Sequence, residues 1–297
     1  MIRTRGWLET GVLLAAVFLA SVWAQDQGPL NTIKVNVRLV EVYATVLDRR
    51  GAYVDGLTSG NFQILEDGRP QRIAIFENNA DALSCAILLD TTGSMKEALP
   101  RVKNSVLKLI DELEPQDSIA IYTFDQRLVL RQDFTTDKEA AKRAVLRTRA
   151  GGSTALFDAI CETAEELSRR RGKKAFVVFT DGDDNSSLLT ASAVVDKAQK
   201  LGIPLYTLAE GEATRSAKLG KLLAELSERT GGASYRVNKA GDIDQVFQKI
   251  AGNLRHLYLL SYIPPAGESD GRWRKIDVVV SGVQDYRLRA KQGYFPE

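Results

Sequence analysis

A short stretch of carboxylate and hydroxyl side chains follows an apolar run near residue 90. The run Cys85–Leu89 ends at Asp90, and hydroxyl side chains stand at the second and fourth positions beyond it, in Thr92 and Ser94. A buried strand that ends in this way presents oxygen atoms at the rim of a sheet. Oxygen atoms are the ligands that hard divalent cations take in proteins.

Two further segments carry oxygen donors in a similar setting. The sequence GGST at residues 151–154 precedes a helix-like stretch, and Asp181 closely follows a second apolar run. Loops at the carboxyl ends of parallel strands meet at one edge of a sheet, so we expect Thr154 and Asp181 to approach Asp90. Two carboxylates and three hydroxyls suit Mg²⁺, which keeps part of its water shell, with Mn²⁺ and Ca²⁺ as alternatives.

The region between residues 82 and 254 alternates short apolar runs with amphipathic stretches. Continuous apolar strands separated by helices indicate a parallel sheet that helices cover on both faces. Arg127–Phe134 follows the preceding strand too closely for a crossover, so we expect an antiparallel edge strand there. The predicted parallel strands are Cys85–Leu89, Ile119–Phe124, Phe176–Phe179 and Leu205–Leu208, and the predicted helices are Arg101–Leu113, Lys138–Val145, Ala155–Ser168, Ala191–Leu201 and Leu219–Arg229.

Residues 25–81, which precede the α/β region, contain short runs with strand character. The dipeptide Asp67-Gly68 is a hairpin signal. The apolar alternation on its two sides predicts strands around Phe62–Ile64 and Ile73–Ile75, joined by this turn.

Residues 255–297, which follow the α/β region, contain three more runs with strand character. Neither terminal β segment is large enough to bury much surface alone. We therefore predict that residues 31–80 and 256–297 form one β-sandwich, with the α/β domain inserted between them. Two small satellites that lie separately on the α/β domain are the alternative.

The spacing D-x-T-x-S at Asp90, Thr92 and Ser94 resembles the metal-ion-dependent adhesion site of von Willebrand factor type A domains. The downstream Thr154 and Asp181 match the rest of that pattern, and the whole chain is similar to exported bacterial proteins with this domain. The resemblance implies a six-stranded, Rossmann-like sheet. It also implies that the hydroxyls ligate Mg²⁺, directly or through water, while the aspartates usually act through water.

The same resemblance implies a binding role, in which an acidic side chain of a protein ligand completes the coordination of the metal. Thr92 departs from the family, which more often has serine, but the hydroxyl is kept and we expect metal binding to survive. The leading interpretation is an exported adhesion or assembly module. The alternatives are a structural envelope subunit with a lapsed metal site, and a Mg²⁺-dependent hydrolase with Asp183 as its base.

Residues 1–24 have the pattern of a secretory signal peptide. Two arginines precede an apolar run that includes Gly11–Ala20, and small residues, Ser21 and Ala24, stand where a signal peptidase would cut before Gln25. The apolar run is shorter than a membrane-spanning helix needs. We expect a secreted or periplasmic protein with no membrane attachment after cleavage, and an uncleaved signal-anchor is the alternative.

The composition argues against several classes of function. With 40 basic and 38 acidic side chains, a net charge of +2 gives no reason to expect nucleic acid. One histidine, His256, cannot build a zinc site or a Ser-His-Asp triad with the cysteines Cys85 and Cys161, which we expect to be free rather than disulfide-bonded. Residues 181–185 begin like an EF-hand loop, but the required glycine and glutamate are missing.

Overall fold

The computed structural model describes residues 39–181, 184–210, 214–237, 242–265 and 270–296. Strands in these ranges form one six-stranded sheet and two four-stranded sheets. No helix in the described ranges is both long enough and apolar enough to span a membrane. The predicted signal peptide lies outside the described residues.

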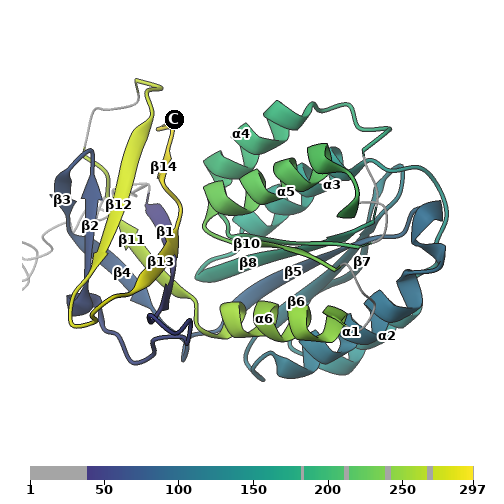
Figure 1. The fold of residues 1–297 in the computed structure, drawn as a ribbon, viewed down its shortest axis with the longest axis horizontal. Helices are drawn as coiled ribbons and strands as arrows, with labels where there is room; N and C mark the ends of the chain where they lie inside the picture. The colour runs from purple at the N-terminus through teal and green to yellow at the C-terminus, as the bar shows by residue number, and fades with distance from the viewer. Residues whose placement is uncertain (1–38, 182–183, 211–213, 238–241, 266–269, 297) are drawn as a thin grey trace, which may run out of the picture. The chain divides into compact units, whose positions relative to one another are not determined.

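The six-stranded sheet is the centre of the α/β domain. Its strands are β5 (Leu83–Asp90), β6 (Ser118–Phe124), β7 (Leu128–Thr135), β8 (Lys173–Thr180), β9 (Leu205–Ala209) and β10 (Ala233–Arg236). They lie in the order β10-β9-β8-β5-β6-β7, and all neighbours are parallel except β6 and β7 (Figure 1). The predicted sheet and its antiparallel edge strand are confirmed.

Helices cover both faces of this sheet, as predicted. They are α1 (Leu99–Glu112), α2 (Lys138–Leu146), α3 (Leu156–Ser168), α4 (Ala191–Leu201), α5 (Ala217–Thr230) and α6 (Ile243–Arg255), with a 3-10 turn η2 (Gly93–Lys96) before α1. Helices α1, α2 and α6 pack on one face, and α3, α4 and α5 pack on the other (Figure 1). Two separate apolar cores result, one on each side of the sheet.

The central strand β5 shows why its sequence is continuously apolar. Cys85 and Ile87 belong to the core under α1, α2 and α6, whereas Ala86 and Leu88 belong to the core under α3, α4 and α5. Successive strand residues point to opposite faces, so a strand that is covered twice has no solvent-facing position. Cys161 lies in the second core, so the sheet separates it from Cys85, and both cysteines are free, as expected.

The terminal β segments build one sandwich-like module. Its strands are β1 (Val40–Leu47), β2 (Phe62–Glu66), β3 (Arg69–Gln71), β4 (Ile73–Glu77), β11 (Tyr258–Tyr262), β12 (Arg274–Val280), β13 (Arg287–Ala290) and β14 (Gly293–Tyr294), with a 3-10 turn η1 (Ser59–Asn61) before β2. The two sheets have the orders β13-β1-β11-β4 and β14-β12-β2-β3, so each sheet contains two strands from the N-terminal segment and two from the C-terminal segment. Both sheets contribute to one apolar core, which excludes two separate satellites.

The hairpin at Asp67-Gly68 is present, but its second strand differs from the prediction. The two residues have φ values of 47° and 79°, as a type I′ turn requires, and they join β2 to β3. The run that begins at Ile73 instead forms β4 in the other sheet, paired with β11. The prediction was wrong because β3 is a short edge strand containing Pro70, which carries no apolar alternation.

The β-module contacts the α/β domain at the amino ends of the parallel strands. The ammonium of Lys174, the second residue of β8, lies 2.8 Å from the carboxylate of Glu41 on β1. The backbone N–H of Lys173, where β8 begins, donates a 2.9 Å hydrogen bond to Glu77 on β4. These contacts leave the carboxyl ends of β5 and β8, on the other side of the sheet, clear of the module.

His256 belongs to this junction. It follows the last residue of α6, and one residue, Leu257, separates it from β11. Its ring stacks on Tyr53 with centroids 4.4 Å apart, and its Nδ1 lies 2.6 Å from Asp55 Oδ1. The only histidine of the sequence therefore serves to pack the helix end against the β-module.

Lys291, which follows β13, is buried at the same junction. Its side chain is 5% exposed, and a Cβ atom at Gly202, the residue that ends α4, would lie 2.8 Å from its Nζ. Burial lowers the pKa of Lys291 to about 8. The attraction to Glu41 opposes this shift in pKa, whereas the repulsion from Lys174 adds to it. The folded state therefore carries a buried charge at neutral pH.

We expect Lys291→Met to change the pH dependence of stability. Between pH 8 and 10.5 the unfolded lysine still binds a proton that the folded one has released, so the unfolding free energy of the wild type should rise with pH by up to about 3 kcal/mol. Urea unfolding at pH 7 and pH 10.5 measures this rise relative to the variant. Lys218→Met, at an exposed position, is the control. Parallel pH profiles for wild type and Lys291→Met would contradict the assignment.

Candidate metal centre

The two predicted carboxylates lie at the carboxyl edge of adjacent strands. Asp90 is the last residue of β5, and Asp181 follows the last residue of β8. The strands are parallel and in register, with Leu89 beside Phe179. Strand β6 flanks β5 on its other side, and Asp90 is therefore fully buried. Asp181 is also buried, with 4% of its surface exposed.

Hydrogen bonds from the ends of β5 and β8 hold the buried Asp90 carboxylate. The backbone N–H of Thr92 donates to Oδ1 at 2.9 Å, and the hydroxyl of Thr180 donates to Oδ2 at 2.7 Å. Burial raises the pKa of Asp90, and the hydrogen bonds from Thr92 and Thr180 oppose that rise. Both oxygens are thereby fixed by neighbours from two different strand ends.

A chain of hydroxyls connects the two strand ends. Thr92 Oγ1 lies 3.0 Å from Ser94 Oγ, and Ser94 Oγ donates a 2.8 Å hydrogen bond to Asp181 Oδ1. Thr92 is 1% exposed, whereas Ser94 is an exposed residue. The oxygen atoms of the cluster therefore run from the interior beside Asp90 to the surface.

The loop that carries Thr154 is tied to the same edge through its backbone. The N–H of Gly151 donates to the carbonyl of Thr91 at 2.7 Å, and the N–H of Gly93 donates to the carbonyl of Gly152 at 3.1 Å. Gly152 has a φ of +87°, and a Cβ there would lie 2.9 Å from the Cβ of Asp125, so this close approach requires glycine.

Thr154 itself is 4% exposed, and its N–H donates to Asn185 Oδ1 at 2.9 Å. Within the described part of the chain, its hydroxyl makes no hydrogen bond to the other four predicted ligands. The structure therefore joins Asp90, Thr92, Ser94 and Asp181 in one network and places Thr154 in a neighbouring loop. The EF-hand-like run is used differently, since Asn185 holds that loop.

Two residues of this edge were not predicted. Thr180 is adjacent to Asp181 and orients Asp90, and only its position at the end of an apolar run could have indicated this. Glu210 follows β9 and is 5% exposed. Its Oε1 accepts a 2.8 Å hydrogen bond from Arg101 on α1, while its buried Oε2 has no partner among the described residues. A carboxylate directly after an apolar strand is the signal that could have found it.

The donor set fits a cation that prefers oxygen and keeps water ligands. The network supplies two carboxylates and two hydroxyls in hydrogen-bond contact, with a third hydroxyl on the adjoining loop. In the described ranges, no group of three or more His, Cys, Asp or Glu side chains could hold a metal. Proteins usually bind Mg²⁺ through one or two carboxylates, and the ion keeps several water ligands, so two carboxylates with neutral hydroxyls are a suitable ligand set.

A family model described as von Willebrand factor type A domain matches residues 85–249, more than half of the chain. Two curated bacterial proteins are similar over part of their length. The uncharacterized protein sll0103 of Synechocystis is 27% identical over 196 residues, 62% of this chain and 45% of that protein. The uncharacterized protein YfbK of Escherichia coli is 29% identical over 164 residues, 52% of this chain and 28% of that protein. The chain thus spans less than half the length of either relative.

Solved structures share the fold. A von Willebrand factor type A protein from Catenulispora acidiphila aligns with a TM-score of 0.52 and 13% identity over 87% of this chain and 74% of that chain. Proximal thread matrix protein 1 from the mussel byssus aligns with a TM-score of 0.51 and 15% identity over 64% of this chain and 49% of that chain. The first alignment is wider than the family match, so the similarity of fold continues beyond residues 85–249.

We expect Thr180→Val to destabilise the metal-free protein. The substitution removes the hydroxyl that donates to Asp90 Oδ2, and losing one hydrogen bond to a buried carboxylate costs about 1–3 kcal/mol of unfolding free energy. Thr180→Ser keeps the hydroxyl and is the matched control. Urea unfolding in a chelated buffer measures both variants, and equal stability for the two would show that this hydrogen bond does not support Asp90.

Proposed function

This chain belongs to the von Willebrand factor type A family, and from that membership we propose that it is a protein-binding module with a Mg²⁺ site at the carboxyl edge of its sheet. The observation that carries the proposal is the hydroxyl chain from Thr92 through Ser94 to Asp181, next to the buried Asp90. The module would grip an acidic group of a protein partner, in adhesion or in assembly of an envelope complex.

Each predicted ligand has a definable part in such a site. Asp90 and Asp181 supply two negative charges that balance a divalent cation, and Thr92, Ser94 and Thr154 supply neutral oxygens. A bound Mg²⁺ would supply a Lewis-acidic position for a carboxylate of the partner. Asp90 is held by Thr92 and Thr180, so protein groups orient this carboxylate.

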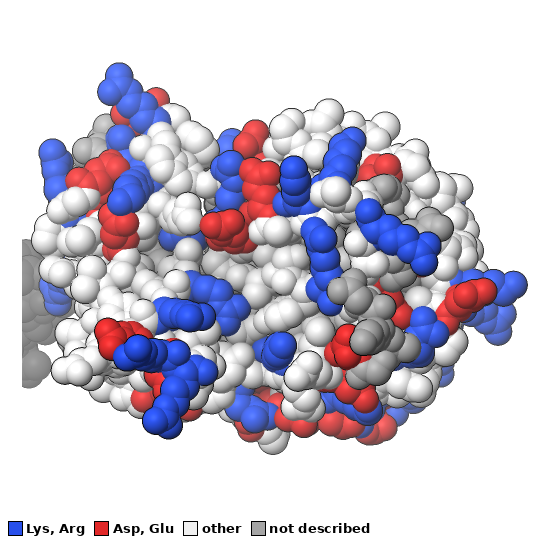
Figure 2. Space-filling view, in the orientation of Figure 1, with Lys and Arg blue, Asp and Glu red and all other residues white. Residues whose placement is uncertain are grey.

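The setting of the edge supports binding of a macromolecule. Ser94 and its neighbour Gly93 are exposed, and the β-module contacts the opposite ends of the strands through Lys174 and Glu41. A partner could therefore approach the edge without displacing the module. The face in Figure 2 carries interspersed basic and acidic side chains, which supports a protein partner rather than nucleic acid.

We propose binding rather than turnover as the role of this edge. Hydrolysis would need a base close to the metal, and Asp183, the base of the hydrolase alternative, lies outside the described residues, so that alternative stays a prediction. The pattern of residues 1–24 supports an exported protein, in the periplasm or secreted. An envelope location is consistent with an adhesion or assembly role.

We expect the purified, metal-free protein to bind one equivalent of Mg²⁺ in a calorimetric titration. Asp181→Ala should abolish the binding, and Ser94→Ala should weaken it by about ten-fold or more, because each removes an oxygen from the cluster. Ser153→Ala is the matched control, since its hydroxyl contacts Ser186 and not the cluster.

Unchanged affinity in the Asp181 and Ser94 variants would contradict the assignment of the site. No saturable binding by the wild type would favour the alternative in which this edge has a structural role only. A pull-down of a protein partner with and without EDTA then distinguishes a metal-centred binding site from an edge with a structural role only. Only a metal-centred contact is lost on chelation.

A further inference from the structure

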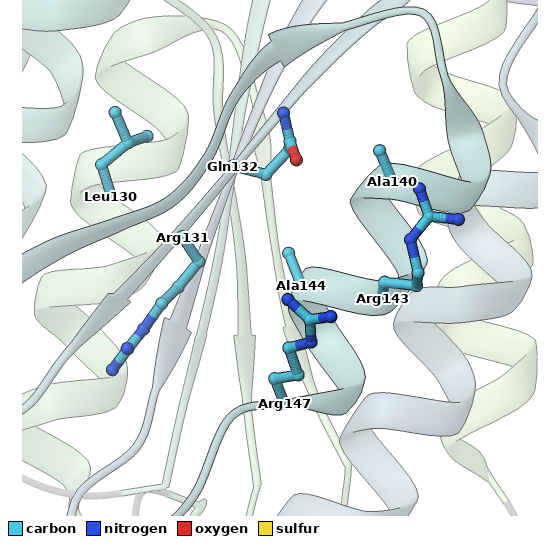
Figure 3. Close-up of a pocket in the computed structure, with 7 residues that line it drawn as sticks. All are labelled: Leu130, Arg131, Gln132, Ala140, Arg143, Ala144 and Arg147. Atoms are coloured by element: carbon cyan, nitrogen blue, oxygen red, sulfur yellow. The ribbon is translucent and has the colours of Figure 1, made fainter.

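An open pocket of about 490 Å³ lies between the edge strand β7 and helix α2 (Figure 3). It is separate from the candidate metal centre, since none of the five predicted ligands lines it. Three of its lining residues are arginines and none is acidic. The residues that line it are Leu130, Arg131, Gln132, Ala140, Arg143, Ala144 and Arg147.

An irregularity in β7 turns one of these arginines into the pocket. Ile121 on β6 pairs with Gln132, and the next residue, Tyr122, pairs with Leu130, so Arg131 is an extra residue in the ladder. Its Nε donates a 2.8 Å hydrogen bond to the hydroxyl of Thr123. A bulge of this kind re-aims a side chain, and here the consecutive residues Arg131 and Gln132 both line the pocket.

Helix α2 and its C-cap contribute two arginines, Arg143 and Arg147, with little neutralising charge. Arg143 and Arg147 are four residues apart, a spacing at which like charges repel on a helix. Arg143 lies 3.6 Å from Asp137, but both side chains are more than half exposed, so this ion pair is weak. In the described part of the chain, the guanidinium of Arg147 makes no ion pair or hydrogen bond.

The C-terminus of α2 explains the positions of Arg143 and Arg147 but not that of Arg131. Cations near a helix C-terminus are stabilised by the helix dipole, which accounts for Arg143 and Arg147 as helix residues. It does not account for Arg131, which comes from a different element and is held by Thr123. Three arginines that line one hollow, with no carboxylate among the lining residues, favour an anionic ligand.

We propose that this pocket binds a small polyanion, a ligand that carries two or more phosphate or carboxylate groups. Figure 3 shows Arg143 and Arg147 on the side of α2 and Arg131 extending from β7 away from them, so the three guanidinium groups do not converge on one point. This spread suits several anionic groups better than one. The volume is in the range of small-molecule sites, and Leu130, which is 50% exposed, offers an apolar contact for the body of the ligand.

Calorimetric titration of the metal-free protein with tripolyphosphate, and separately with citrate, tests the proposal and distinguishes phosphate from carboxylate ligands. We expect at least one of the two to bind with one saturable equivalent at constant ionic strength. The Arg143→Gln, Arg147→Gln double variant should bind it about ten-fold more weakly or worse, because two charge-assisted contacts are lost.

The matched control is the Lys218→Gln, Lys221→Gln double variant, which removes two exposed charges from α5, outside the pocket. Its affinity should change by less than about two-fold. Equal losses in both double variants would mean a general charge effect and would overturn the proposal. Failure of the wild type to bind either probe saturably would also overturn it.

Two more variants test whether the polyanion binds in this pocket, through the guanidinium of Arg131, and not at the candidate metal centre. Arg131→Lys keeps the charge but loses the planar fork and the bond to Thr123, so we expect weaker binding of the polyanion. Asp181→Ala should leave the polyanion affinity unchanged, because it belongs to the other site. Loss of polyanion binding in Asp181→Ala would place the ligand at the metal centre and contradict the proposal, whatever the outcome for Mg²⁺.

Discussion

The burial of one carboxylate at the end of a central strand is the constraint on which the candidate site depends. Asp90 lies between β8 and β6 with no exposed surface, so the protein must replace the water that its charge would otherwise hold. Thr92 and Thr180 do so from the two sides of the cluster. The same contacts bring the hydroxyl chain to Asp181, and hence the strand ends that hold Asp90 also assemble the oxygen atoms proposed as ligands.

The two ends of the parallel sheet have different roles: the amino ends contact the β-module, and the carboxyl ends form the candidate site. At the amino ends, Lys174 and Glu41 form an ion pair in which the lysine is almost fully buried, and Lys291 packs against the ends of α4 and α5. These contacts attach the β-module. At the carboxyl ends, loops from β5 and β8 and the loop before α3 meet without the module. A partner bound at that edge would meet a surface fixed by backbone contacts such as Gly151 to Thr91.

Much of this arrangement could be predicted from sequence because it follows from local patterns. Apolar runs covered on both faces identified β5, β6, β8 and β9, and oxygen-bearing residues after two of them indicated the edge. Strand β10 was not identified from its residues, since they are only partly buried. Glu210 and the bulge at Arg131 escaped because their roles depend on which strands become neighbours, which no short stretch encodes.

The central claim is that the oxygen cluster of Asp90, Thr92, Ser94 and Asp181 is a divalent cation site. Anomalous diffraction from crystals soaked in Mn²⁺, which prefers similar oxygen ligands, tests it most directly. We predict an anomalous peak at the carboxyl edge of the sheet, in contact with the hydroxyls of Thr92 and Ser94. A map with Mn²⁺ bound elsewhere on the protein and no peak at this edge would contradict it.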